Sequence, residues 1–231
     1  MLPVIIVRPE PGASSTLQSA LGMGLDAHAY PIFTVRPVFW TPVPRDAVDA
    51  VLVGSANALR HGGAGLKTLH GLPAYCVGQT TAQAAERAGF VVVAVGSGGL
   101  QGVLSSLDGS HRRLLRLAGV SHVPLTPPAG TTMDTRIVYE SAAVPACEGL
   151  TDILKHPAVV LLHSGEAAAH FERICTQAAI DRSRIALAAI GPRVAERAGQ
   201  GWAMVRSADE PTDAALLALA REMCQDAARV P

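Results

Sequence analysis

The chain has 231 residues, of which 49% are hydrophobic, 16% charged and 4% aromatic. This length fits one large domain or two compact ones, and the apolar content excludes a disordered chain. Nineteen basic and nineteen acidic side chains give a formal net charge of zero, which excludes the strong positive field of a general nucleic-acid or anionic-membrane binder.

Short runs rich in Val, Ile and Leu alternate with longer segments that carry Ala, Glu, Arg and Leu at helical spacing. In chain order, the predicted strands are 4–7, 50–53, 73–77, 91–95, 114–117, 159–162, 185–190 and 203–206. The predicted helices are 14–21, 56–61, 81–88, 100–107, 166–177, 193–198 and 212–226. Strands that are apolar throughout and alternate with helices indicate parallel sheets covered on both faces. The predicted fold is therefore α/β and doubly wound.

An internal repeat indicates two similar domains. VLVGSANAL (51–59) resembles VLLHSGEAA (160–168), and VGQTTAQAAERAGF (77–90) resembles IGPRVAERAGQGW (190–202). In the same order, AVGSGGLQGVLSSL (94–107) falls opposite VRSADEPTDAALLALA (205–220). The members of each pair lie about 110 residues apart. The chain is therefore expected to hold two copies of one α/β unit.

The second copy lacks an opening strand and helix, and the N-terminal segment supplies such a unit. We therefore predict a discontinuous domain of residues 1–34 plus 145–231, with an inserted domain of residues 35–144. Segments at about 34–40 and 135–144 are extended and β-rich, and we expect them to pair as a two-stranded β-ladder hinge. Such a ladder is only marginally stable alone, which favours motion of one domain against the other.

The start of the chain, MLPVIIVRPEPG, is typical of a first strand and not of a signal peptide, because no positive segment precedes its short apolar run. No stretch approaches the roughly eighteen unbroken apolar residues of a membrane span. The four cysteines, Cys76, Cys147, Cys175 and Cys224, lie far apart with no CxxC pair, as expected of buried thiols in a reducing compartment. We expect a cytoplasmic protein that acts away from membranes, with a monomer as the default.

A dinucleotide site is the most tempting motif, because VVVAVGSGGLQG (91–102) places a Gly-rich turn between a strand and a helix. The glycine pattern fails at Gln101, and the next strand, RRLLRLAG, ends without an acid to bind the ribose. The equivalent turn of the other copy, ADEPTDAAL, has no glycine. A nicotinamide-dependent oxidoreductase is therefore disfavoured.

Metal and nucleophile chemistry find little support in the sequence. No histidine pair shows the HExxH pattern or a nearby carboxylate at ligand spacing, so His163 and His170 are expected to be surface or capping residues. We predict no metal site. Ser55 and Ser164 each follow a strand, where serine is an ordinary helix N-cap, and no base is positioned to activate either one.

Turns of one kind recur along the chain: a strand, then Ser, Thr or Gly, then a helix. They lie at Gly54-Ser55, Gly78-Gln79-Thr80-Thr81, Gly96-Ser97-Gly98, Ala118-Gly119, His163-Ser164 and Gly191-Pro192. The carboxyl ends of parallel strands bind ligands, and helix N-termini there present N–H groups to carboxylates or phosphates. Turn chemistry explains each loop singly, but two such sets on two domains favour a cleft lined by donors. Arg8, directly after the first strand, is the best cationic candidate to face it.

The motifs, taken together, resemble one family. VRPEPGASSTLQSALGMG, VGSANAL, VGQTTAQAAERAGF, LRLAG, IVYES, IGPRVAERAGQGW and EPTDAALLAL occur over nearly the whole chain in an order similar to that of uroporphyrinogen-III synthases. The resemblance implies two domains joined by a β-ladder hinge. It also implies an enzyme of haem biosynthesis that cyclises hydroxymethylbilane to uroporphyrinogen III, with loss of the hydroxyl and inversion of ring D. The family uses no metal and no cofactor.

The resemblance also implies site residues. Tyr139, in IVYES, matches the family's cleft tyrosine and is expected to assist departure of the hydroxyl. The resemblance implies substrate contacts from Ser55, Ala56, Asn57, Gly78, Gln79, Thr80, Thr81, Ala82, Ser164 and Gly191. Arg8 and Gly119 are expected to join them because each lies just after a predicted strand. Val194 stands where family members often carry threonine, and Ser164-Gly165 replaces the usual turn. From that part of the chain, backbone donors are therefore expected more than side chains.

A non-catalytic reading stays open at this point. A two-domain, hinge-type binding module for a small polycarboxylate would share the fold and the donor-rich turns. The family has no indispensable catalytic residue whose absence would identify such a module. Formation of isomer III from hydroxymethylbilane would separate the enzyme from the module.

Overall fold

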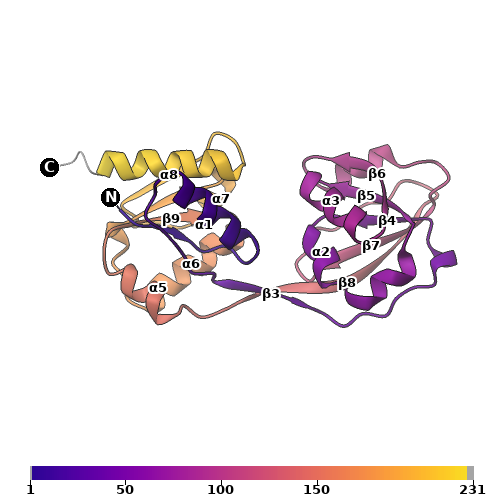
Figure 1. The fold of residues 1–231 in the computed structure, drawn as a ribbon, viewed down its shortest axis with the longest axis horizontal. Coiled ribbons are helices and arrows are strands. Elements are labelled where there is room, and N and C mark those ends of the chain that lie inside the picture. Colours follow the sequence, from indigo (N-terminus) through magenta and orange to yellow (C-terminus); the bar gives the residue numbers. More distant parts are fainter. Residues whose placement is uncertain (1, 228–231) are drawn as a thin grey trace. The chain divides into compact units, whose positions relative to one another are not determined.

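The computed structural model describes residues 2–227 (Figure 1). Contacts within the chain divide it into two compact units. Unit 1 consists of Met1–Thr34 with Ala142–Pro231, and unit 2 consists of Val35–Ser141. In the described part of the chain, no helix is long and apolar enough to cross a membrane.

Unit 1 is built on a five-stranded parallel sheet in the order β11-β10-β9-β1-β2. Its strands are β1 (Val4–Ile6), β2 (Ala27–Ala29), β9 (Ala158–Leu162), β10 (Ile185–Ala189) and β11 (Met204–Ser207). Helices α1 (Gly12–Gly22) and α8 (Asp213–Ala227) pack with Val4 and Ile6 on one face. Helices α5 (Glu148–Ile153), α6 (Gly165–Gln177) and α7 (Pro192–Glu196) contribute to the cluster of Ile5 and Val7 on the other. Burial on both faces explains why the central strands carry no polar side chain.

Unit 2 is built on a six-stranded sheet in the order β3-β8-β7-β4-β5-β6. Its strands are β3 (Phe33–Pro37), β4 (Ala50–Val53), β5 (Pro73–Val77), β6 (Val91–Gly96), β7 (Arg113–Gly119) and β8 (Thr132–Ala143). Helices α2 (Ala56–His61) and α3 (Gln79–Arg87) cover one face, with Val51 and Val53. Helix α4 (Leu100–Val103) and the 3₁₀ turn Leu104–Ser106 cover the other, with Ala50 and Leu52. Further 3₁₀ turns lie at Arg45–Ala47, Gly63–Leu69 and Arg182–Arg184.

The two sheets repeat one topology. The order β6-β5-β4-β7-β8 in unit 2 corresponds to β11-β10-β9-β1-β2 in unit 1, with every pair parallel in both. Strands β1 and β2 thus hold the places of β7 and β8. One connection differs, because α1 joins β1 to β2 whereas no helix joins β7 to β8. The prediction of an α/β fold with parallel sheets is confirmed.

The structure corrects several details of the predicted elements. Two short elements, β2 and α5, were missed, because three and six residues carry too little periodicity to detect. The predicted helix 100–107 is α-helical only to Val103 and continues as a 3₁₀ turn, in which the Ser105 hydroxyl donates to the Gly102 carbonyl (2.7 Å). Three cysteines are buried as expected, but Cys147 is exposed because it lies at the N-terminus of α5 on the surface.

Asp49 ties the start of β4 to the start of β7. Its carboxylate accepts hydrogen bonds from the backbone N–H groups of Arg112 (2.9 Å) and Arg113 (2.8 Å) and from the Arg113 guanidinium (2.6 and 3.1 Å). The guanidinium also donates to the carbonyl of Asp46 (2.7 Å). Bonds from Arg113 lower the pKa of Asp49 to about 2. The ionised carboxylate therefore fixes how the two strands enter the sheet.

We predict that Asp49→Ala lowers the stability of the protein by about 1–2 kcal/mol at pH 7, because it removes a charged acceptor of several hydrogen bonds. Since the pKa of Asp49 is lowered on folding, this contribution is full above about pH 4 and is lost as the pH falls toward 2. The measurement is the urea midpoint of wild type and variant across this range. Asp134→Ala, which removes an exposed pair with Arg136, should change the midpoint little. Equal losses in both variants would contradict the role of Asp49.

Candidate functional site

In each unit, small and polar residues gather where parallel strands end and helices begin. In unit 2, Gly54 and Ser55 lead from β4 into α2. Ser55 is the N-cap residue, and its hydroxyl oxygen accepts a hydrogen bond from the Asn57 N–H group (3.3 Å). Ala56 is buried, and the Asn57 side chain accepts a bond from Arg60 (3.1 Å). Ser55 therefore performs the capping role that its sequence position predicts.

The turn from β5 into α3 depends on Gly78. Its φ of 76° lies in the left-handed region that favours glycine. The Gly78 carbonyl accepts the N–H groups of Thr81 and Ala82 (both 3.1 Å), and both of these residues are buried. Gln79 and Thr80, by contrast, are exposed and open the helix. Because the first N–H groups of a helix have no partner within it, Gln79 and Thr80 are the residues of this turn best placed to donate outward.

Tyr139 lies on β8 beside the end of β7. The register between these strands shifts after Ala118, so that Gly119 faces Tyr139. The Tyr139 ring is half-buried and packs against the core cluster of α2 and α3, while the Val120 N–H donates to the Tyr139 carbonyl (3.1 Å). Thus two residues of the predicted site, Gly119 and Tyr139, are direct neighbours.

In unit 1, Ser164 and Gly191 occupy corresponding turns. Ser164 caps α6, and its hydroxyl oxygen accepts a bond from the Ala167 N–H group (3.1 Å). Gly191 precedes α7 with an extended φ of −177° that any residue could adopt. Pro192 opens that helix, and Pro has no N–H to offer. The amides of Val194 and Ala195 already donate to the Gly191 carbonyl (3.0 and 3.2 Å).

A second polar group in unit 1 joins Arg8, Thr16, His163 and Asp213. The Arg8 guanidinium donates to Asp213 (3.0 Å) and to the hydroxyl of the buried Thr16 (3.2 Å). That hydroxyl in turn donates to Asp213 (2.7 Å), and Nε2 of His163 lies 2.8 Å from the same carboxylate. Arg8 follows β1 and His163 follows β9, which are adjacent strands. Asp213 thus links the first residue of α8 to the carboxyl ends of two central strands.

Burial governs the charge state of this group. The His163 side chain is only 8% exposed, and burial lowers its pKa, although the bond to Asp213 opposes the shift. For Asp213, burial raises the pKa, but hydrogen bonds from His163 and Thr16 and the Arg8 charge outweigh it and leave the pKa lowered. At neutral pH the group therefore contains an Asp213 carboxylate, an Arg8 cation and a neutral His163.

The interpretation of His163 as a surface or capping residue was wrong. Its carboxylate partner lies 50 residues away in the sequence, so no local spacing could reveal the pair. The internal repeat held a usable signal, because it aligns the strand before His163 and the segment that contains Asp213 with neighbouring elements of unit 2. Arg8 was expected to face a ligand, yet its guanidinium is bound to Asp213 and Thr16.

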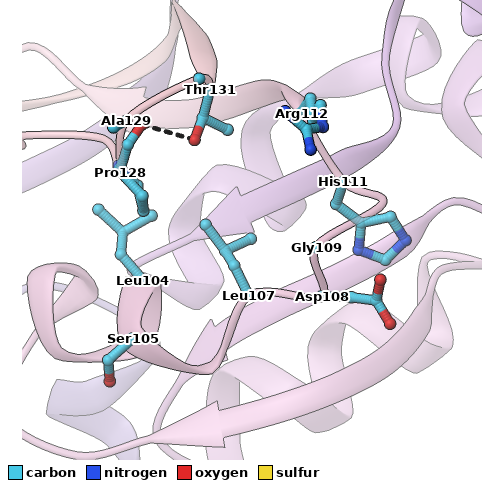
Figure 2. Close-up of a pocket in the computed structure, with 11 residues that line it drawn as sticks. Leu104, Ser105, Leu107, Asp108, Gly109, His111, Arg112, Pro128, Ala129 and Thr131 are labelled. Atoms are coloured by element: carbon cyan, nitrogen blue, oxygen red, sulfur yellow. Dashed lines mark hydrogen bonds between the residues drawn. The ribbon is translucent and has the colours of Figure 1, made fainter.

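A pocket of about 380 Å³ opens in unit 2 at the amino-terminal ends of β7 and β8, opposite the strand ends that carry the predicted site (Figure 2). It is lined by residues that precede β7, including Asp108, His111 and Arg112, and by the segment that leads into β8, where the Thr131 hydroxyl donates to the Pro128 carbonyl (2.7 Å). No residue of the predicted site lines this pocket. Among residues 2–227, no group of three or more His, Cys, Asp or Glu side chains is arranged to hold a metal ion.

The fold and these turns define an α/β protein of two units with mainly parallel sheets, in which the turns of the predicted site lie at the carboxyl ends of strands. A sequence model of the uroporphyrinogen-III synthase HemD family matches residues 15–218. The chain belongs to this family, which confirms the resemblance seen in the sequence.

Solved structures support the same fold. A uroporphyrinogen-III synthetase from Helicobacter pylori aligns with a TM-score of 0.65 and 15% identity, over 96% of this chain and 100% of that one. A mutant uroporphyrinogen III synthase from the extremely thermophilic bacterium Thermus thermophilus aligns with a TM-score of 0.52 and 17% identity, over 97% of this chain and 100% of that one. Among curated proteins, none matches the sequence significantly.

We predict that His163, in the polar group of unit 1, makes the stability of the protein depend on pH at values above those at which carboxylates ordinarily take up protons. The folded protein holds His163 neutral, whereas the unfolded chain takes up a proton there near the ordinary value of 6.5. Stability should therefore fall as the pH drops from about 7 to 5. His163→Gln keeps an N–H donor for Asp213 and should flatten this fall, measured as the urea midpoint against pH.

The exposed His156 provides the matched control, and His156→Gln should leave the wild-type slope. An unchanged slope in His163→Gln would show that this histidine does not titrate on unfolding.

Proposed function

We propose that the protein is a uroporphyrinogen-III synthase. It converts hydroxymethylbilane to uroporphyrinogen III with loss of water and inversion of ring D, as a cyclising lyase of haem biosynthesis. The observation that carries the proposal is the family match, which extends over residues 15–218 and so includes parts of both units. The match favours this enzyme over a non-catalytic binding module, which would bind a polycarboxylate without converting it.

The reaction needs control of geometry more than strong acid or base chemistry. Loss of the hydroxyl leaves an electrophilic azafulvenium. The enzyme must direct attack from a substituted ring carbon, which gives a spiro intermediate, in place of the easier closure without inversion. Positioning of reacting groups supplies several kcal/mol of such discrimination.

We assign Tyr139 to protonation of the departing hydroxyl. Its phenol lies at the end of β7, where parallel strands of this fold class present ligand-binding groups. The ring is fixed by packing on the core of unit 2, yet part of it stays exposed to solvent. An acid held in place in this way contributes a factor of about 10² to 10⁴.

We assign recognition of the substrate's eight carboxylates chiefly to backbone N–H groups. The exposed start of α3, at Gln79 and Thr80, and the start of α6 after Ser164 each present amides to an anion. Ser55, Asn57 and Gly119 lie at strand ends of unit 2, and Gly191 lies at a strand end of unit 1. Recognition by amides suits a chain of zero net charge, because partial charges at strand ends need no global positive field. The pairing of Arg8 with Asp213 argues against a direct substrate contact from its guanidinium.

We further propose that units 1 and 2 are the two domains and that the paired strands β3 and β8 form the hinge between them. The Val38 N–H donates to the Val138 carbonyl (3.0 Å), and the Val144 N–H donates to the Ile32 carbonyl (2.9 Å), so the two strands run antiparallel. As the family resemblance implies, we propose an enzyme that needs no metal and no cofactor, and we propose further that it is cytoplasmic and acts as a monomer.

The decisive experiment supplies freshly generated hydroxymethylbilane to the purified protein, oxidises the products and resolves isomers I and III. We predict that isomer III predominates with the protein and isomer I without it. A ratio equal to that of the protein-free reaction, in a protein shown to be folded, would reject the enzyme and favour the binding module.

We predict that Tyr139→Phe lowers turnover by about 10²-fold or more, because the phenol no longer donates a proton. The product should shift toward isomer I, and the melting temperature should change little because the ring stays in place. The chain has three tyrosines, and Tyr30→Phe serves as the control that should keep wild-type turnover. Unchanged rate and isomer ratio in Tyr139→Phe would remove Tyr139 from the mechanism.

A further inference from the structure

Gly119 leaves space that the Tyr139 ring occupies. A Cβ atom at position 119 would lie 2.6 Å from Cζ of Tyr139, 2.8 Å from Cε2 and 3.0 Å from the phenol oxygen. Non-bonded carbon atoms prefer separations of about 3.5–4.0 Å. Even the smallest side chain at position 119 would therefore displace the hydroxyl-bearing end of the ring.

The backbone gives no separate reason for glycine here. Gly119 is not one of the glycines with positive φ, so its conformation is open to alanine. Gly78 shows the opposite case, since its φ is 76° and a Cβ there would meet nothing within 4 Å. Glycine at position 78 thus serves the backbone, whereas glycine at position 119 serves the neighbouring ring.

The strand pairing places the ring over this gap. Residues pair in step from Arg113 to Ala118, and the shift before Gly119 brings Tyr139 opposite it in place of Val138. Val138 is fully buried in the core, and the Val120 N–H holds the Tyr139 carbonyl at 3.1 Å. The main chain on both sides of the ring is therefore fixed, and the space above Gly119 decides where the phenol oxygen lies.

We propose that Gly119 is a positioning residue of the active site, which sets the place of the Tyr139 hydroxyl relative to the substrate. The inference rests on the proposed function of Tyr139 as the proton donor. It assigns to Gly119 a role other than direct contact with substrate: the lack of a side chain at the end of β7 aims the acid on β8. A displaced acid slows departure of the hydroxyl, and misplacement by about 1 Å can cost about 10²-fold in rate.

The geometry is tested by NMR of tyrosine ring carbons. With three tyrosines in the chain, the Tyr139 signal is identified by its loss in Tyr139→Phe. We expect Gly119→Ala to shift the Tyr139 ring signal and to leave that of Tyr75, which is buried in the same unit and hydrogen-bonded to His111. An unshifted Tyr139 signal would overturn the proposal without any measurement of activity.

Kinetics test the consequence. Gly119→Ala should lower kcat by about 10²-fold, with a smaller change in KM and a shift of product toward isomer I. Added to Tyr139→Phe, the same substitution should cause little further loss, because the hydroxyl it misplaces is already gone. Equal losses in both backgrounds would show that Gly119 acts independently of the Tyr139 hydroxyl and would overturn the proposal.

Gly109→Ala is the matched control, since Gly109 is a unit 2 glycine whose added Cβ meets nothing within 4 Å. It should keep wild-type turnover. If Gly119→Ala does not fold, the double variant Gly119→Ala/Tyr139→Ala should regain the melting temperature of Tyr139→Ala, because the ring that clashes has been removed. Failure of that rescue would contradict the steric argument.

The outcome also separates this inference from the proposed function. A wild-type protein that forms no excess of isomer III rejects the function and, with it, the catalytic role of this geometry. Wild-type activity together with full activity in Gly119→Ala rejects the positioning role alone.

Discussion

Burial of the central strands on both faces is the constraint from which the rest of each unit follows. Val4 and Ile6 of β1 pack against one layer of helices while Ile5 and Val7 pack against the other, and β4 divides its residues between two layers in the same way. A strand enclosed in this way has little room for a polar side chain. With the exception of Arg116 in β7, the charged side chains of the central strands therefore lie at strand ends, and at the carboxyl ends polar groups meet the free N–H groups of helices that begin there. The same packing that stabilises the sheets thus determines where chemistry can occur.

The two units carry one topology but fill the equivalent strand ends differently. Gly54 follows β4 as His163 follows β9, and each is succeeded by a serine that caps a helix. In unit 1, His163 reaches Asp213 at the start of α8, and Arg8 closes the group. In unit 2, a Cβ on Gly54 would lie 3.1 Å from Leu100 at the start of α4, so the corresponding contact is apolar and small. Unit 1 thus fills this strand end with its own paired charges, while unit 2 leaves it lined by small residues beside Tyr139. The duplicated fold has diverged in chemistry where the constraint on polarity is weakest.

The positions of the main strands and helices and the order of the turns were predictable from the sequence, whereas the pairing of side chains was not. Apolar runs and turn residues located β4, β5 and α2 to the residue, because a strand buried on both faces is a short apolar run bounded by turn residues, and the capping Ser55 marks the start of the helix. The ordered turns also pointed to the family. The use of each turn was beyond the sequence: Thr81 is buried in its own helix, Arg8 is bound to Asp213, and Gly119 accommodates a ring twenty residues away. Each of these facts depends on which strand lies next to which, and on a register shift that no local preference predicts.

The connection from β7 to β8 differs from the connection between β1 and β2, because it contains no helix. Arg116 takes the place in β7 that Ile6 takes in β1, as the pairings with Leu52 and Leu161 show. Its guanidinium is buried and donates to the Val123 carbonyl (2.8 Å), while Nε is buried without a partner among the described residues. Burial lowers the Arg116 pKa. A buried cation is costly unless it is paired or hydrogen-bonded. The Arg116 guanidinium is bonded to a loop in which Val120 and Val123 are exposed. Such a loop has few apolar contacts and opens more readily than a packed helix. Where unit 1 has helix α1, unit 2 therefore has a loosely packed segment that adjoins Gly119, next to the side chain we assign to proton transfer.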